Sequence, residues 1–314
     1  MLVFVLSAAA WSAQPDVEPE TVLYFSYPGD SIYQVDVGLK NPQKFVTTEN
    51  GEHIQSFATR MVGERQETYA IIADMTTEPP GPSILCRVDA NKLVTVGTFP
   101  ATEKVTAICI DGNGSVWMSA SEGYFYDGVW PPTAVDDLGG ADFLLEHGGA
   151  LFACIGDTFN VFSVEANGPL IKLKSRILSH QIQKWHGIAL PKKMRPLAVY
   201  AAGNPAVNEC ELTMSWSDHS PAPVSQYYSW IVTCKLSDIL LAGVEDRKVV
   251  PYYMSPEIKY QVRGVTRAPD PPNDVIMSVY GPPHLKILIT RGAQLTVAGR
   301  PDQAQFVQWP EKRP

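Results

Sequence analysis

One pattern occurs six times along the chain and constrains the fold more than any other feature. A β-rich apolar run is followed by a turn with Gly, Pro or Asp, and then by a second β-rich run. Such runs, bounded by turn residues, are typical of short strands. The six pairs lie at 22–27 and 32–37, 69–75 and 83–89, 115–120 and 124–128, 151–156 and 160–165, 211–217 and 227–236, and 274–280 and 285–290.

Two further runs complete most of these units. A third run follows most pairs, at 44–48, 92–99, 170–175, 247–253 and 294–299. Another run precedes each pair from the second onward, at 53–59, 105–111, 141–147, 186–190 and 263–269. Four strands in about 45–50 residues is the size of a propeller blade. Helical spacing is weak and confined to the connectors at 174–185 and 237–243.

The repeat predicts an all-β fold, a six-bladed β-propeller of four-stranded antiparallel blades, as a single domain over 13–314. The first pair lacks a preceding run, whereas an unmatched run occurs near the C-terminus. Because an open ring would leave two exposed sheet edges, we expect Phe306–Trp309 to close the first blade. A surface-packed tail is the alternative for this segment, and a two-sheet sandwich is the alternative for the whole fold.

The N-terminus and the charge bear on location. The apolar run Leu2–Ala10 and the small residues after it predict a signal peptide over 1–12 and a secreted protein. A short buried strand is the alternative. No later run is long enough to span a membrane. The net charge of −8 and the pI near 5.3, without a basic stripe, weigh against a nucleic-acid partner.

Five cysteines are present, without a CxxC motif. Cys210 and Cys234 would lie roughly opposite each other if 210–234 forms a hairpin that bends near Pro221–Pro223. This geometry allows a disulfide in a secreted protein; two buried free thiols are the alternative. The other three cysteines lie in apolar runs and are expected in the core.

Three stretches resemble known propellers. ICIDGNGSVWMSASEGYFYDG (108–128) resembles the pattern shared by NHL repeats, two-component-regulator propeller repeats and the gluconolactonase/regucalcin family, which contains calcium-dependent lactonases and phosphotriesterases. VLYFSYPGDSIYQVDV (22–37) and HGIALPKKMRPLAVYAAG (186–203) resemble blades of the last group. The resemblance implies the fold and says little about function, because many unrelated propellers share this pattern. Asn113 also begins a glycosylation sequon.

In enzymes of the gluconolactonase type, four oxygen ligands for a metal lie where inner strands start around the central tunnel. The resemblance implies these matching positions in successive blades: Glu52 or His53, Thr106, Ala141 or Asp142, His186, Arg263, and Gln303 or Gln305 in the closing strand. The oxygen set is not preserved, and an arginine is unfavourable beside Ca²⁺. Two histidines do not complete a catalytic zinc site. We therefore expect no catalytic metal and assign no catalytic residue; calcium stays the alternative cofactor.

The candidate ligand-binding residues at the tunnel are His53, Thr106, Asp142, His186 and Arg263. A mildly cationic funnel of His53, His186 and Arg263 would suit a small anionic or sugar-like ligand. His186 as an ordinary hydrogen-bonded histidine and Arg263 as an ion-paired cation are the alternatives. The sequence thus predicts a secreted binding module for such a ligand or for a protein partner. A hydrolase or lactonase acting on a small ester or lactone through a modified tunnel is the alternative function.

Overall fold

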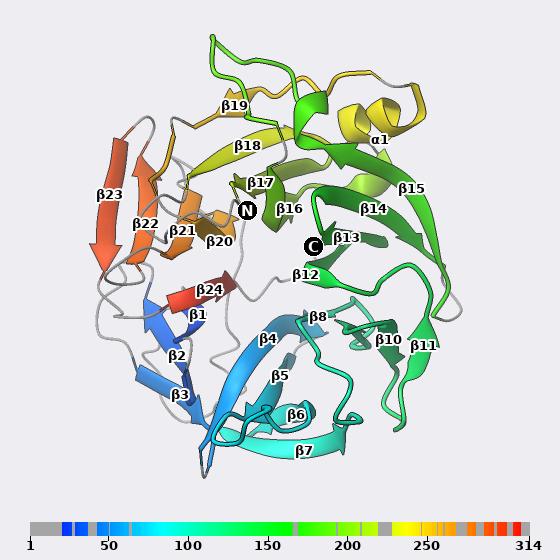
Figure 1. Ribbon diagram of the computed structural model, residues 1–314, viewed down its shortest axis with the longest axis vertical. Coiled ribbons are helices and arrows are strands. Elements are labelled where there is room, and N and C mark those ends of the chain that lie inside the picture. Colours follow the sequence, from blue (N-terminus) through cyan, green and yellow to red (C-terminus); the bar gives the residue numbers. More distant parts are fainter. Residues whose placement is uncertain are drawn as a thin grey trace.

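The computed structural model describes residues 21–26, 29–36, 43–49, 51–62, 65–165, 169–192, 194–207, 209–218, 228–245, 247–255, 257–259, 261–267, 275–280, 286–291, 294–299 and 304–308. These residues form six four-stranded antiparallel sheets placed around a common centre, as in a β-propeller (Figure 1). Each sheet is given from the centre outward. The first contains β24 (Ala304–Gln308), β1 (Thr21–Ser26), β2 (Ser31–Asp36) and β3 (Gln43–Thr47). The second contains β4 (Glu52–Val62), β5 (Arg65–Asp74), β6 (Ile84–Asp89) and β7 (Lys92–Thr98), and the third contains β8 (Ala107–Ile110), β9 (Val116–Ser119), β10 (Gly123–Tyr126) and β11 (Thr133–Val135).

The remaining three sheets follow the same order. They are β12 (Ala141–His147), β13 (Ala150–Ile155), β14 (Thr158–Val164) and β15 (Ile171–Leu178); β16 (Arg195–Ala202), β17 (Glu211–Ser217), β18 (Ser229–Lys235) and β19 (Tyr253–Met254); and β20 (Gln261–Arg267), β21 (Val275–Tyr280), β22 (Lys286–Arg291) and β23 (Gln294–Gly299). Helix α1 (Leu236–Glu245) and the short 3₁₀ turns η2 (Ser179–Gln181) and η3 (Pro205–Val207) lie between strands.

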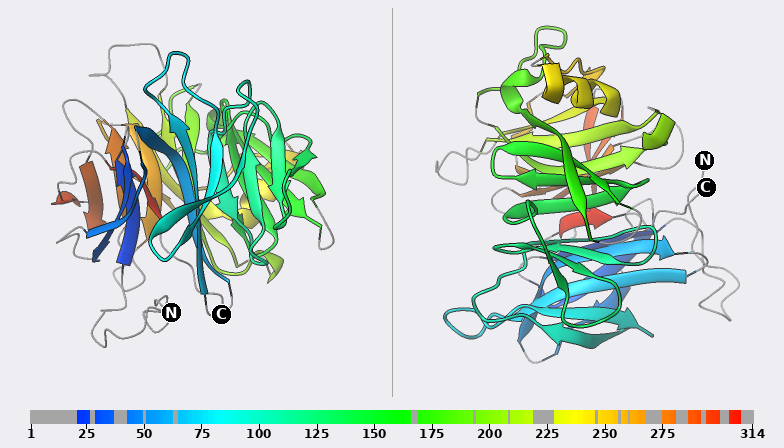
Figure 2. Two further views of the ribbon diagram at one scale, coloured as in Figure 1. Left: turned by 90° about the horizontal axis from the view of Figure 1, so that it is seen from below. Right: turned by 90° about the vertical axis from the view of Figure 1, so that its right-hand side faces the viewer.

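Neighbouring sheets contact one another in sequence around the centre. Their inner strands contact in the order β4, β8, β12, β16, β20 and β24. The first and second sheets contact through β2 with β4 and β3 with β7. Strand β24 pairs antiparallel with β1, with Leu23 opposite Gln308. The side views show the sheets standing edge-on around this centre (Figure 2).

The turn at 111–115 shows why the sequence pattern produces a strand reversal. The Asp111 carboxylate accepts hydrogen bonds from the backbone N–H groups of Asn113 (2.8 Å) and Ser115 (3.0 Å). Its second oxygen accepts one from the indole Nε1 of Trp117 (3.3 Å). Gly114 has φ +90°, a conformation that suits a residue without a side chain. Trp117 is fully buried among apolar side chains of the third and fourth sheets. The turn therefore fixes both the reversal and one large core residue.

A buried ion pair joins three inner strands. Arg60 of β4 contacts the Glu146 carboxylate of β12, and both residues are buried. The same guanidinium nitrogen, Nη1, donates to the backbone carbonyls of Ile110 in β8 (2.9 Å) and Glu146 (3.0 Å). The other Glu146 oxygen accepts from the Gly149 backbone N–H (2.7 Å). Three consecutive sheets are thus held by one charged contact between residues that are 86 positions apart.

Several expectations differ from the structure. The fifth unit's inner strand is Arg195–Ala202 and not 186–190, which forms a turn and its flanks. The connector at 174–185 is largely the end of β15 followed by η2. The expected helical turns at 237–243 do lie in α1. The predicted signal peptide, 1–12, lies outside the described residues.

Cys210 and Cys234, the predicted disulfide pair, are both buried and carry no disulfide in this structure. The register of β17 and β18 places Leu212 opposite Cys234, so the two cysteines are not directly paired across the hairpin. In the described part of the chain, no helix is long and apolar enough to cross a membrane.

Candidate functional site

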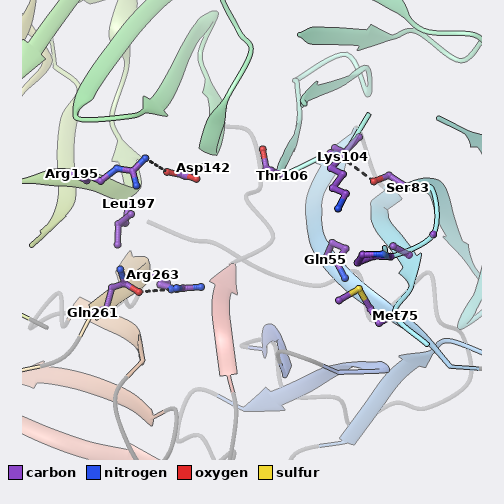
Figure 3. Close-up of a pocket in the computed structure, with 14 residues that line it drawn as sticks. Gln55, Met75, Ser83, Lys104, Thr106, Asp142, Arg195, Leu197, Gln261 and Arg263 are labelled. Carbon is purple, nitrogen blue, oxygen red and sulfur yellow. Dashed lines mark hydrogen bonds and ion pairs between the residues drawn. The ribbon is translucent and has the colours of Figure 1, made fainter. Parts of the chain in front are cut away.

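A cavity of ≈ 470 Å³ lies where the inner strands begin (Figure 3). Its volume is within the range of small-molecule sites. Five sheets contribute to it, through the inner strands β4, β8, β12, β16 and β20 and the segments around them. The lining residues are Gln55, Ala73, Met75, Pro80, Gly81, Ser83, Lys104, Val105, Thr106, Asp142, Arg195, Leu197, Gln261 and Arg263.

A β-bulge explains how four of these side chains reach the cavity. Strands β4, β12, β16 and β20 each lose register with the next strand at a single extra residue. These residues are Gln55, Asp142, Leu197 and Arg263. A bulge leaves its extra residue out of the ladder, bends the strand and redirects a side chain. All four bulged residues line the cavity.

The two other inner strands show related irregularities. The backbone N–H of Thr106 bonds to the Ser119 carbonyl (2.8 Å), although Ala107 is the residue paired with Ser119. Thr106 therefore occupies the bulge position at the start of β8, and it lines the cavity. Strand β24 skips one residue, Gln305, between its pairs with Phe25 and Ser26. Each of the six inner strands thus has one irregular position in its first half or directly before its first residue.

Basic side chains dominate the charge of the cavity. The lining contains three cations, Lys104, Arg195 and Arg263, and one carboxylate, Asp142. Arg195 Nη2 lies 3.4 Å from Asp142 Oδ2, and Arg195 Nε donates to the Gly156 carbonyl (3.0 Å). The described residues of the lining therefore carry a net positive charge in a protein whose formal charge is −8.

Hydrogen bonds in the cavity engage some of its acceptors and leave one buried donor unsatisfied among the described residues. Arg263 Nε donates to Gln261 Oε1 (2.7 Å), which engages that amide's carbonyl oxygen. The Thr106 hydroxyl donates to the Ala141 carbonyl (2.7 Å). Gln55 Nε2 is buried and has no hydrogen-bond partner among the residues that the structure describes. An amide donor in that situation destabilises the protein unless a ligand or water accepts its proton.

Three of the predicted site residues meet at this cavity and two do not. Thr106, Asp142 and Arg263 line it. His53 lies two residues before the bulge of β4, and Gln55 occupies the lining position instead. His186 is exposed, has φ +46° and packs its ring edge-on against Trp185 at 4.3 Å. It lies outside the described lining because it precedes β16, whose cavity residues are Arg195 and Leu197.

Five polar residues of the lining were not predicted from the sequence: Gln55, Ser83, Lys104, Arg195 and Gln261. Lys104 lies two residues before Thr106, and Arg195 lies two residues before the bulge at Leu197. The same offset places Gln261 before Arg263. A search for polar residues two positions before each inner-strand site could have found Lys104, and it would have found Arg195 once the strand 195–202 was recognised.

The lining does not fit the calcium ion that the lactonase resemblance implies. Ca²⁺ takes six to eight oxygen ligands, commonly including several carboxylates. Here the bulge positions hold one carboxylate, Asp142, together with Leu197 and the cation Arg263. Within the described residues, no group of three or more His, Cys, Asp or Glu side chains could hold a metal ion.

Asn113, the sequon residue, is exposed in its turn and is not among the cavity-lining residues.

The fold and the central cavity define a β-propeller, and comparisons with solved structures agree on this fold. A chain of the nidogen/laminin complex matches with a TM-score of 0.55 and 11% identity, over 91% of this chain and 97% of that one. A putative 6-phosphogluconolactonase from Bacteroides uniformis matches with a TM-score of 0.51 and 10% identity, over 92% and 98%. The SapL1 lectin, solved with alpha methyl fucoside, matches with a TM-score of 0.50 and 9% identity, over 91% and 96%.

These likenesses are too distant in sequence to show more than the fold. No protein-family model matches the chain. No curated protein matches it either.

Proposed function

We propose that this protein is a six-bladed propeller, closed by β24, that binds a small acidic molecule in its central cavity. The observation that carries the proposal is the donor-rich, net cationic lining. Carboxylates and phosphates only accept hydrogen bonds, whereas sugar hydroxyls both donate and accept. Two of the acceptors in the lining are already engaged: Asp142 by Arg195 and Gln261 Oε1 by Arg263.

Binding rather than catalysis is the function we infer. The propeller structures that match this chain include a lectin and a chain of a laminin complex, so this fold serves binding in other proteins. A protein partner would be an alternative use of the outer surface. Secretion is part of the proposal and is supported by the sequence pattern of 1–12. The relation to NHL and gluconolactonase propellers likewise remains a prediction from sequence.

Calorimetric titration at low ionic strength tests the proposal. The panel contains a simple carboxylate, inorganic phosphate, a neutral hexose and an alkylamine. The anions should bind and the hexose and amine should not, and binding should weaken as salt screens the charges. Lys104→Gln should weaken anion binding, whereas Lys92→Gln, an exposed residue of the outer strand β7, should not. Preference for the neutral hexose, or no anion binding, would contradict the proposal.

The hydrolase alternative is tested with the same protein. A lactone and a phosphotriester are incubated with it, with and without calcium, and product is measured. Turnover abolished by Arg263→Gln and retained in Lys92→Gln would favour the alternative. Absence of turnover together with anion binding would favour the binding module.

A further inference from the structure

We infer that the central cavity selects a ligand with two anionic groups on a short carbon skeleton. This inference rests on the proposed function and names its ligand class. It predicts two binding positions for anionic groups, here called seats, on opposite walls of the cavity, with apolar side chains beside them.

The first seat lies on the wall built by the second and third sheets. Lys104 precedes β8, and Gln55 is the bulged residue of β4. Lys104 is exposed to the cavity and forms no ion pair within the described part of the chain. Gln55 Nε2 is the buried donor without an acceptor. An ammonium group beside an unsatisfied amide N–H is a suitable pair of donors for a carboxylate or phosphate oxygen.

The second seat lies on the wall built by the fifth and sixth sheets. Arg195 and Arg263 project into the cavity there, across from Lys104 and Gln55 (Figure 3). Each guanidinium is oriented by its Nε: Arg195 by the Gly156 carbonyl and Arg263 by Gln261. A guanidinium oriented in this way is well suited to bind a carboxylate or phosphate.

The charge of the lining favours two anionic groups over one. Three cations and one carboxylate line the cavity. The carboxylate, Asp142, is already ion-paired with Arg195. A dianion can place one acidic group at each of the two seats, whereas a monoanion can occupy only one of them. Attraction between these charges is stronger in a recessed site than in bulk water, because water screens them less.

Two apolar side chains line the cavity beside the two seats, and the cavity is of limited size. Leu197 lies near the arginine wall and Met75 near the lysine wall (Figure 3). A cavity of ≈ 470 Å³ has room for about fifteen water molecules at about 30 Å³ each. A carbon skeleton of a few atoms would contact both apolar side chains while its acidic ends reach the two walls. Linear dicarboxylates and phosphorylated carboxylic acids share this chemistry.

The test is calorimetric titration of the full chain with matched ligands. One arm contains the dicarboxylates from malonate to adipate, and a second contains 2-phosphoglycolate. Butyrate, glycolate and the monomethyl ester of succinate serve as monoanions. The best dianion should bind at least tenfold more tightly than its matched monoanion, because a hydrogen bond to a charged group contributes that much affinity. The arm containing the tighter ligand identifies the second acidic group as carboxylate or phosphate.

Two substitutions test the two seats separately. Lys104→Gln and Arg263→Gln should each lower dianion affinity about tenfold, to the level of the monoanion. Lys92→Gln should leave it unchanged. Because Lys104 is exposed, its variant should fold normally even if Arg263→Gln does not, and circular dichroism checks both. If monoanions bind as tightly as dianions, this inference is overturned and the proposed function stands. If no anion binds at all, both are overturned.

Discussion

Replacing Arg60 with methionine should strongly destabilise the protein. Arg60 and Glu146 are 5% and 3% exposed, and their contact joins β4 to β12. Removing one partner leaves the other as a buried charge without compensation, which costs about 3–5 kcal/mol. The Ile110 carbonyl also loses the Arg60 donor at 2.9 Å. Methionine keeps most of the apolar stem, so cavity formation adds little. We expect a loss of at least about 3 kcal/mol.

Urea unfolding followed by tryptophan fluorescence measures this loss. The chain contains 7 tryptophans, and Trp117 and Trp216 are fully buried. With a slope of about 3 kcal/mol per molar urea, the midpoint should fall by about 1 M. The exposed Arg65, at the start of β5, provides the control, because Arg65→Met should change stability by less than about 0.5 kcal/mol.

A double variant separates charge burial from the loss of one side chain. Arg60→Met with Glu146→Leu leaves no buried charge, and replacement of a buried ion pair by apolar residues is often neutral or stabilising. The double variant should therefore be more stable than Arg60→Met alone. A single variant within about 1 kcal/mol of the native protein would refute the reasoning, as would a double variant less stable than the single one.

Three further predictions concern a glycine, a turn and a thiol. A Cβ at Gly97 would lie 2.2 Å from Trp130 Cδ2, so Gly97→Ala should displace that ring and cost about 1–3 kcal/mol in urea unfolding. Asp111→Ala removes the acceptor for two backbone N–H groups and for Trp117, and should cost about 1–3 kcal/mol, measured in the same way. Burial raises the pKa of the Cys86 thiol from 9.0 to about 11. As the pH rises, the Cys86 thiol of the unfolded chain loses its proton before that of the folded protein, so the free energy of unfolding should fall between pH 9 and 11. Over the same pH range, the urea midpoint of Cys86→Ser should fall less than that of the native protein.

Each of these three has a control and a contrary outcome. Val94→Ala, at an exposed position of the same strand as Gly97, should be nearly neutral. Equal stability of the two variants would contradict the proposed clash. Asp111→Asn keeps one acceptor oxygen and should recover part of the loss; no difference between Asn and Ala would contradict the role of the carboxylate. An alkaline loss of the same size in Cys86→Ser would assign that loss to other groups.

The repeat predicted the strands well where the turn between them is formed by residues that are close in sequence. The turn at Asp111–Ser115 and the burial of Trp117 follow from residues within a few positions of one another. The prediction failed at 186–190, where a short apolar run follows Trp185. The true strand, Arg195–Ala202, was missed because it contains a proline and resembles a connector more than a strand start. The near-helical spacing of 174–185 was misleading because Ile177 is buried by packing against other sheets.

The site was predictable in part. Thr106, Asp142 and Arg263 were found because the third, fourth and sixth inner strands begin where the pattern places them. Gln55 was missed because a bulge depends on the pairing of two strands, which single-strand periodicity does not contain. The ion pair between Arg60 and Glu146 was unpredictable for a related reason, since its partners are 86 residues apart and meet only when three sheets assemble.

The bulges give this protein a way to change its ligand without changing its fold. Each inner strand places one side chain outside the hydrogen-bonded ladder, so that residue contributes little to the pairing of its own sheet. The positions are also far apart in sequence, and each can be substituted independently. Directed evolution restricted to Gln55, Thr106, Asp142, Leu197 and Arg263 would therefore sample many cavity chemistries while the surrounding strands keep their register.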